Sequence, residues 1–323
     1  MTDDATLVPT AEELEHVLED LMQVEKFEPP RSFRQQARIT DPEVYAEAAR
    51  DPEGYWAGRA RELHWHQPFE TVLDDSNPPF YKWFSDGELN LSYNCLDRHV
   101  EAGHGDRVAF HWLGEEGETR TITYADLLAD VQRLSNGLRD LGVTRGDVVG
   151  IFLPMIPEVV VAMLACARIG AQHNVVFGGF SPTSVRDRME VSDAKVLITV
   201  DGARRKGKTA PIKPAVDEVM GDLPKLEKIV VVRGTGVEVA MQEGRDVWYD
   251  ELLSASAAEC PADPMPSDTP LFILYSSGST AKPKGILHTT GGYLTGVAAT
   301  TKDVFDLKPE TDVYWCSADV GWV

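Results

Sequence analysis

Apolar and polar residues follow a regular pattern along the middle of the chain. Short, mostly apolar runs of strand length occupy residues 147–153, 174–177, 195–200, 228–232 and 271–275. Helical spacing of apolar residues fills several of the segments between them, at residues 125–141, 157–169 and 182–191. Two more strand patterns, at 108–112 and 121–124, precede the first of these helices. The pattern therefore predicts strands that alternate with helices.

The composition of these strands indicates the fold class. Strands that are apolar along their whole length are typical of a parallel sheet buried on both faces. Together with the alternating helices, they predict an α/β fold in which helices cover both faces of a parallel sheet. Right-handed crossovers between the strands are then expected.

The first hundred residues have a different character. An amphipathic helix is predicted over residues 11–25, and a second helix follows Asp41 and Pro42, which suit a helix start. Residues 56–84 are rich in aromatic residues interleaved with prolines. This composition predicts an irregular segment that packs its aromatic side chains onto a larger body.

Charge and cysteine content narrow the function classes. The formal net charge is -21, with 43% hydrophobic and 26% charged residues, so we expect neither nucleic acid nor membrane as a partner. The four cysteines are far apart in the chain, which favours free thiols, and Cys166 is predicted to be buried. The acidic amino terminus lacks a signal-peptide pattern, and no stretch is long and apolar enough to span a bilayer. We therefore expect a soluble, cytoplasmic protein.

The loop after the strand at 271–275 carries candidate phosphate chemistry. Its residues are Ser276, Ser277, Gly278, Ser279, Thr280, Ala281, Lys282, Pro283, Lys284 and Gly285. Backbone N–H groups, hydroxyls and two lysines suit a polyphosphate. The loop is not a Walker A motif, because proline rather than a hydroxyl residue follows Lys282. By composition alone, a solvated surface loop fits equally well.

The order of residues in this loop resembles the signature loop of the acyl-adenylate-forming, or AMP-binding, superfamily, which includes the acyl-CoA synthetases. Four other segments resemble the acetyl-CoA synthetases in particular, at residues 77–84, 92–99, 288–293 and 312–323. The resemblance extends from about residue 40 to the end of the chain. It implies an acyl-CoA synthetase amino-terminal segment over 37–95 and an incomplete AMP-binding domain over 96–323, and the residues before them are expected to form an acidic helical extension over 1–36.

The resemblance also implies site residues. The phosphates of ATP are assigned to Ser277, Gly278, Ser279, Thr280, Lys282 and Lys284. Coenzyme A is assigned to Phe177, Gly178, Gly179 and the basic run Arg205, Lys206, Gly207 and Lys208. Val323 is assigned to the wall of an acetate pocket. Ala281 departs from the family's glycine, at a cost of about 1 kcal/mol if that position needs positive φ.

The implied reaction is ATP-dependent ligation of acetate to coenzyme A through acetyl-adenylate, with ATP, coenzyme A and magnesium (Mg2+) as cofactors. The metal ligands and the domain with the catalytic lysine are expected beyond residue 323, so we expect an incomplete chain that is inactive alone. His288 is interpreted as structural, because the attacking carboxylate is already ionised. Two alternatives remain open: part of a synthetase for propionate or another short-chain acid, and a non-catalytic module that binds nucleotide or coenzyme A.

Overall fold

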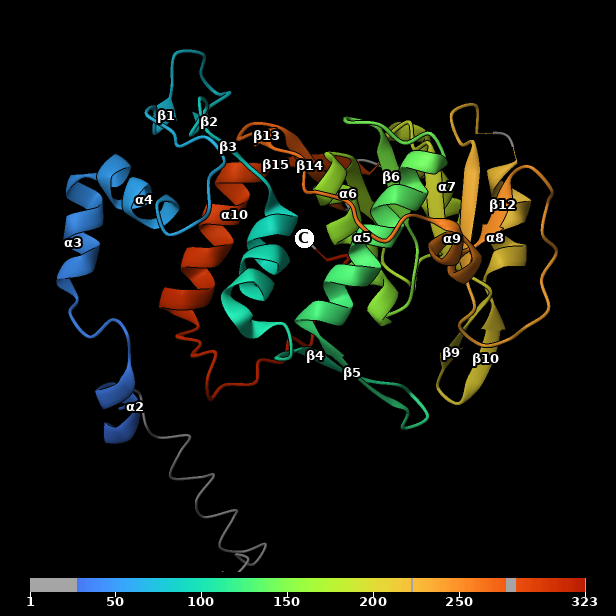
Figure 1. The fold of residues 1–323 in the computed structure, drawn as a ribbon, viewed down its shortest axis with the longest axis horizontal. Coiled ribbons are helices and arrows are strands. Elements are labelled where there is room, and N and C mark those ends of the chain that lie inside the picture. Colours follow the sequence, from blue (N-terminus) through green and yellow to red (C-terminus); the bar gives the residue numbers. More distant parts are fainter. Residues whose placement is uncertain (1–27, 222, 277–282, 323) are drawn as a thin grey trace, which may run out of the picture.

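The computed structural model describes residues 28–221, 223–276 and 283–322, and it contains a central seven-stranded sheet (Figure 1). The helix predicted over 11–25 lies outside the described residues. From one edge to the other, the strands are β12 (Asp246–Trp248), β11 (Lys228–Val232), β8 (Val196–Val200), β6 (Val148–Ile151), β7 (Gln172–Val175), β14 (Pro270–Ser276) and β15 (Lys284–Thr289). The first six run parallel to one another, and β15 runs antiparallel to β14. The predicted α/β class is confirmed, with the antiparallel last strand as an addition.

Helices cover both faces of this sheet. They are α5 (Tyr124–Asp140), α6 (Pro157–Ile169) and α9 (Tyr249–Ala255) on one face, and α7 (Pro182–Val191) and α8 (Lys213–Met220) on the other. Neighbouring residues of β8 show why both faces are apolar: Ile198 packs in the core beneath α5 and α6, whereas Leu197 packs in the core beneath α7 and α8. Successive side chains of a strand point to opposite faces, so a strand with a core on each side must be apolar throughout.

The boundaries of β7 differ from the prediction. The strand begins at Gln172 and ends at Val175, whereas residues 174–177 were expected. Gln172 joins the strand because its backbone N–H donates to the carbonyl of Asp147 at 2.9 Å. Its side-chain amide N–H also donates to the carbonyl of Gly146 at 2.8 Å, which ties this polar residue to the start of the strand.

The aromatic segment packs beside the main sheet as predicted. Between residues 28 and 89 the structure contains α2 (Arg31–Gln36), α3 (Glu43–Arg50), α4 (Pro52–Ala60), β1 (Leu73–Asp74), β2 (Lys82–Trp83) and β3 (Glu88–Leu89), of which α4, β1 and β2 belong to the aromatic segment. The rings of Phe69 and Phe84 lie 4.6 Å apart between centroids, and Trp65 packs against both. Phe80 and Tyr81 are exceptions, because 72% and 55% of their surfaces are exposed. The cluster gives this irregular segment a small core of its own.

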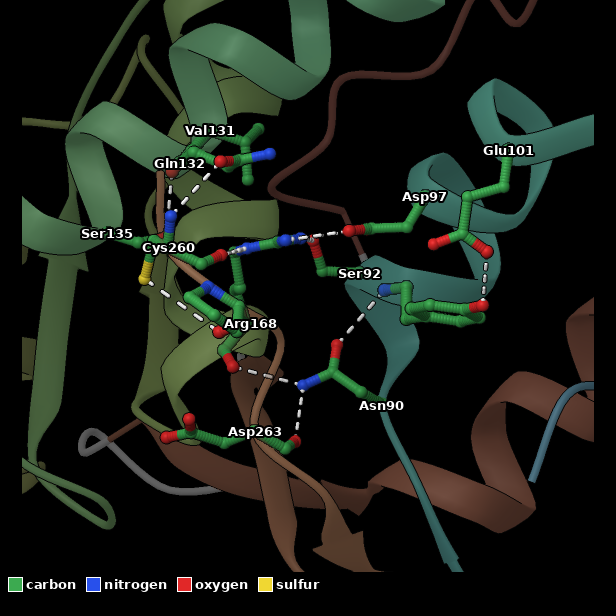
Figure 2. Close-up of polar contacts among 12 residues, drawn as sticks. Asn90, Ser92, Asp97, Glu101, Val131, Gln132, Ser135, Arg168, Cys260 and Asp263 are labelled. Carbon is green, nitrogen blue, oxygen red and sulfur yellow. Dashed lines mark hydrogen bonds and ion pairs between the residues drawn. The ribbon is translucent and has the colours of Figure 1, made fainter. Parts of the chain in front are cut away.

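A buried arginine ties distant segments together, as Figure 2 shows. The guanidinium of Arg168, in α6, is 1% exposed and donates to both carboxylate oxygens of Asp97 at 2.7 and 2.8 Å. Its Nε donates to the carbonyl of Cys260 at 2.5 Å. Beside it, the amide of Asn90 donates to the carbonyls of Arg168 and Asp263 at 3.0 and 2.8 Å. This network joins the segment before the sheet, a covering helix and the connection that precedes β14.

Candidate functional site

Three of the predicted site segments follow strands at the same edge of the sheet. Residues 177–179 follow β7, residues 277–282 follow β14, and the basic run at 205–208 follows β8. Because these strands are parallel, their carboxyl ends share one edge, which is where open α/β sheets bind ligands. The pairing of Phe272 with His173 places the last residue of β14 level with residue 177. β8 and β14 are three strand spacings apart, about 14 Å.

Of the two glycines after β7, Gly178 lies close to the backbone that follows β6, and Gly179 lies close to the ring of Phe177. A Cβ on Gly178 would lie 3.0 Å from the carbonyl oxygen of Leu153, which is tighter than most Cβ contacts in proteins. A Cβ on Gly179 would lie 2.5 Å from the ring of Phe177. Glycine at these positions lets the chain turn tightly and leaves its backbone accessible at the ligand edge.

The last described residues pack on this same turn. A Cβ on Gly321 would lie 2.6 Å from the backbone nitrogen of Phe177, and the ring of Trp322 lies 6.0 Å from that of Phe177. The carboxylate of Asp319 accepts the N–H of Gly321 at 2.8 Å, and burial raises the pKa of that carboxyl. Val323 itself lies outside the described residues. The segment predicted to lead to the acetate pocket therefore lies beside the segment predicted to bind coenzyme A.

Most of the predicted phosphate loop lies outside the described residues, namely Ser277, Gly278, Ser279, Thr280, Ala281 and Lys282. Its two ends are described. Ser276 ends β14 and pairs with Lys284, the exposed first residue of β15. The strands thus form a hairpin that opens at the ligand edge and holds Lys284 there.

Aromatic rings form a ladder across the last three strands. Phe272 in β14 lies between His173 in β7 and His288 in β15, with centroid separations of 5.2 and 4.5 Å. Burial lowers the pKa of His288, and it lowers the pKa of His173 to about 3. Both rings are therefore neutral near pH 7. His288 also lines a pocket of about 440 Å³ with Trp83 and Tyr293. This packing supports the interpretation of His288 as a structural residue.

The basic run lies at the tip of a two-stranded hairpin. β9 (Gly202–Arg205) and β10 (Lys208–Pro211) pair antiparallel, with Arg205 opposite Lys208. The turn residues Lys206 and Gly207 have φ of 52° and 69°, the positive values that a two-residue turn with a right-handed twist requires. The turn therefore brings Arg205 and Lys208 together at the exposed end of the hairpin.

A buried carboxylate fixes the base of this hairpin. Asp201, at the end of β8, is 1% exposed and accepts the backbone N–H groups of Gly234 at 2.9 Å, Thr235 at 3.0 Å and Gly236 at 2.8 Å. These residues follow β11, so the carboxylate ties the carboxyl ends of two neighbouring strands. The N–H of Gly202 also donates to Asp201 at 2.6 Å, which anchors the start of β9.

Sequence reasoning missed one cation at this edge. Arg188, in α7, is buried and lies over the ring of Phe180 at 4.6 Å and that of Tyr275 at 5.6 Å. It links the turn after β7 to the strand that enters the phosphate loop, and burial lowers its pKa. Its position three residues after Val185, on the buried face of α7, was the available signal.

Several negative findings apply to the part of the chain that the structure describes. It brings together no group of three or more histidine, cysteine, aspartate or glutamate side chains suited to a metal ion. Among its helices, none combines the length and apolar character needed to cross a bilayer. All four cysteines are free, and burial raises the pKa of Cys166 to about 12.

The chain belongs to the AMP-binding enzyme family, whose profile matches residues 96–323. The preceding residues of the chain, 42–95, match the profile described as "Acetyl-coenzyme A synthetase N-terminus". The chain is 56% identical over 306 residues to the acetyl-coenzyme A synthetase of Rubrobacter xylanophilus, and 56% identical over 304 residues to that of Streptomyces avermitilis. The family resemblance drawn from the sequence is therefore confirmed.

A solved structure has the same fold. The acetoacetyl-CoA synthetase from Streptomyces lividans is 30% identical, with a TM-score of 0.77, and the match covers 87% of this chain and 45% of that one. The two synthetase sequences are matched over 94% of this chain but over only 47% and 46% of their own length. The chain thus spans just under half the length of the curated relatives it matches.

Proposed function

We propose that this chain is the amino-terminal part of an acetate–CoA ligase, which joins acetate to coenzyme A in a reaction driven by ATP. The observation that carries the proposal is the 56% identity to acetyl-coenzyme A synthetases over almost the whole chain. The acetoacetyl-CoA synthetase is only 30% identical, so acetate is favoured over a longer acid. We keep the expectation of a cytoplasmic location and the division at 1–36, 37–95 and 96–323.

The proposed reaction has two steps. An acetate oxygen attacks the α-phosphorus of ATP, the bond to the bridging oxygen breaks, and pyrophosphate leaves. The sulfur of coenzyme A then attacks the acetyl carbonyl carbon, and the bond between that carbon and the oxygen joined to phosphorus breaks. AMP leaves with that oxygen, and the thiol proton is released to solvent. Fixed cations and backbone N–H groups stabilise the charge that develops on phosphate and carbonyl oxygens. The described residues supply no magnesium ligand set, so no step is assigned to a metal held by them.

The site residues keep the roles that the resemblance implied. We assign the ATP phosphates to Ser277, Gly278, Ser279, Thr280, Lys282 and Lys284, coenzyme A to residues 177–179 and 205–208, and the acetate wall to Val323. The assignment is supported by the shared edge: Phe177 follows β7, the basic hairpin follows β8, and Lys284 pairs with Ser276 at the carboxyl end of β14. No catalytic residue is assigned within the chain.

Completion of the chain tests this proposal. We expect no acetyl-CoA from the 323-residue chain, because it corresponds to less than half of an acetyl-coenzyme A synthetase. Fused to the part of the Rubrobacter xylanophilus relative beyond its match, it should form acetyl-CoA from acetate, ATP and coenzyme A, and should prefer acetate to propionate. A fusion that folds but shows no ATP–pyrophosphate exchange would contradict the proposal, and so would turnover by the chain alone.

A further inference from the structure

The basic hairpin has two different faces. Arg204 pairs with Thr209 across the hairpin, and Arg205 pairs with Lys208. Because neighbouring residues of a strand point to opposite faces, Arg204 projects from one face and Arg205 from the other. Residues directly opposite each other in a pair share a face, so Lys208 projects with Arg205. Arg204 therefore lies on one face of the hairpin, and Arg205 and Lys208 lie on the other.

One face of the basic hairpin contacts acidic side chains from another part of the chain. β4 (Val108–Leu113) and β5 (Thr119–Thr123) form a second hairpin, and its turn carries Glu115, Glu116 and Glu118, here called the acidic turn. The Arg204 guanidinium donates to Glu116 and, at 2.6 Å, to Glu118. The N–H of Gly207 donates to Glu115 at 3.2 Å. Ion pairs among the described residues include none made by Arg205 or Lys208.

We propose that the acidic turn is a positioning element for the coenzyme A site. By holding Arg204 and the N–H of Gly207, it fixes the pose of the basic hairpin and leaves Arg205 and Lys208 to face the 3′-phosphate of coenzyme A. An isolated two-stranded hairpin is marginal in water, and β10 is exposed along its whole length, so the pose depends on such contacts. The inference rests on the proposed function, which assigns coenzyme A to this hairpin.

The charge of the acidic turn gives a sharp test. If the acidic turn acted only through its negative electrostatic field, which repels anions, replacing its glutamates with glutamine would strengthen the binding of an anion. If it positions the hairpin, the same change should weaken binding although Arg205 and Lys208 are intact. The two explanations thus predict opposite signs for Glu116→Gln/Glu118→Gln.

The experiment is calorimetric titration of the 323-residue chain with adenosine 3′,5′-bisphosphate, the phosphorylated nucleoside end of coenzyme A. We expect Glu116→Gln/Glu118→Gln to weaken binding about tenfold and to speed amide exchange across residues 202–211. Arg204→Met should do the same. The matched control is Asp263→Asn, which removes a carboxylate of similar exposure that pairs with Arg139, and it should leave both measurements unchanged.

Two results would overturn the inference in different ways. If the wild-type chain binds the bisphosphate but the double variant binds it equally or more tightly, the acidic turn does not position the hairpin, and the coenzyme A assignment stands. If the wild-type chain does not bind the bisphosphate, the coenzyme A assignment of the hairpin fails, and this inference fails with it.

Discussion

Arg168 shows how much a single buried side chain determines in this protein. It is a cation within the apolar helix at 157–169, and its charge is matched by Asp97, 71 residues earlier in the chain. A buried ion pair is not in itself strongly stabilising, but removal of one partner leaves the other charged and buried. The side chain therefore makes the packing of three segments interdependent.

Asp97→Asn tests this dependence. The substitution keeps the size of the side chain and removes its charge, so we expect the free energy of unfolding to fall by about 3–5 kcal/mol. The midpoint of urea denaturation, followed by circular dichroism, measures the change.

Asp263→Asn is the matched control for this prediction, because Asp263 pairs with Arg139 at the same 2.7 Å but at the surface. An exposed pair of this kind contributes about 1 kcal/mol or less. Equal shifts of the two denaturation midpoints would show that the Arg168 network is not the constraint described here.

Only one member of the Arg168–Asp97 pair could have been identified from the sequence. An arginine inside an apolar helical pattern could have indicated a buried pair, because an unpaired charge is not tolerated in a core. Its partner could not be found, since no spacing rule connects Arg168 with Asp97 across 71 residues. For the same reason the acidic turn and Arg204, 86 residues apart, could not be paired from the sequence.

At the scale of elements, the two glycines in the turn after β7 have different neighbours. Gly178 faces the backbone carbonyl of Leu153, which cannot move without disturbing β6. Gly179 faces the ring of Phe177, which is the far end of a side chain and can shift more readily than backbone. Glycine at position 178 thus avoids a close contact with fixed backbone, whereas glycine at position 179 avoids a close contact with a side chain.

This difference predicts unequal effects of alanine. Gly178→Ala should destabilise the chain by about 1–3 kcal/mol, as overpacking against fixed backbone does, whereas Gly179→Ala should cost less. Gly179→Ala should instead displace the ring of Phe177 and change the fluorescence of Trp322, which packs on it. Urea denaturation with tryptophan emission measures both effects, and a reversed order of stability would contradict this account of the turn.

The basic hairpin was missed at this scale because its residues lack the usual signs of a strand. Arg204, Arg205, Lys208 and Thr209 show no apolar alternation, since the hairpin projects from the sheet and buries little of itself. The turn pair of Lys206 and Gly207 departs from the common asparagine–glycine signal, although its backbone has the positive φ values of that turn.

At the scale of the molecule, the pattern of apolar strands predicted the class of fold and both covered faces. It did so because β6 and β8 are buried at every position, and such strands have no other stable arrangement. The antiparallel direction of β15 was not predictable from apolar pattern, because strand direction depends on the length and path of the preceding loop. Most of β15 is also exposed, including Leu287.

Exposed apolar groups are frequent in the last elements, α10 (Thr290–Ala299) and the residues after it. Val304, Val313, Trp315 and Trp322 have 74%, 85%, 84% and 66% of their surface exposed. Apolar surface of this kind marks interaction sites or promotes association.

We therefore expect the isolated chain to bind the dye ANS and to self-associate with increasing concentration in sedimentation experiments. Trp315→Ser should reduce both effects. Tyr45→Ser is the matched control, since Tyr45 is 79% exposed on α3, a helix that also carries Glu43, Glu47 and Arg50, and it should contribute to neither. A chain that stays monomeric and does not increase the fluorescence of ANS would contradict the exposure of these apolar side chains.

The central claim is that the carboxyl edge of the sheet binds coenzyme A through the basic hairpin. Calorimetric titration of the chain with coenzyme A and with dephospho-coenzyme A, which lacks the 3′-phosphate, tests it most directly. The account predicts that the wild-type chain prefers coenzyme A by about tenfold or more, since two cations lose a charge-assisted partner when the phosphate is removed. Arg205→Ala should lose most of this preference. Equal affinity of the wild-type chain for the two ligands, or full preference retained by Arg205→Ala, would contradict the account.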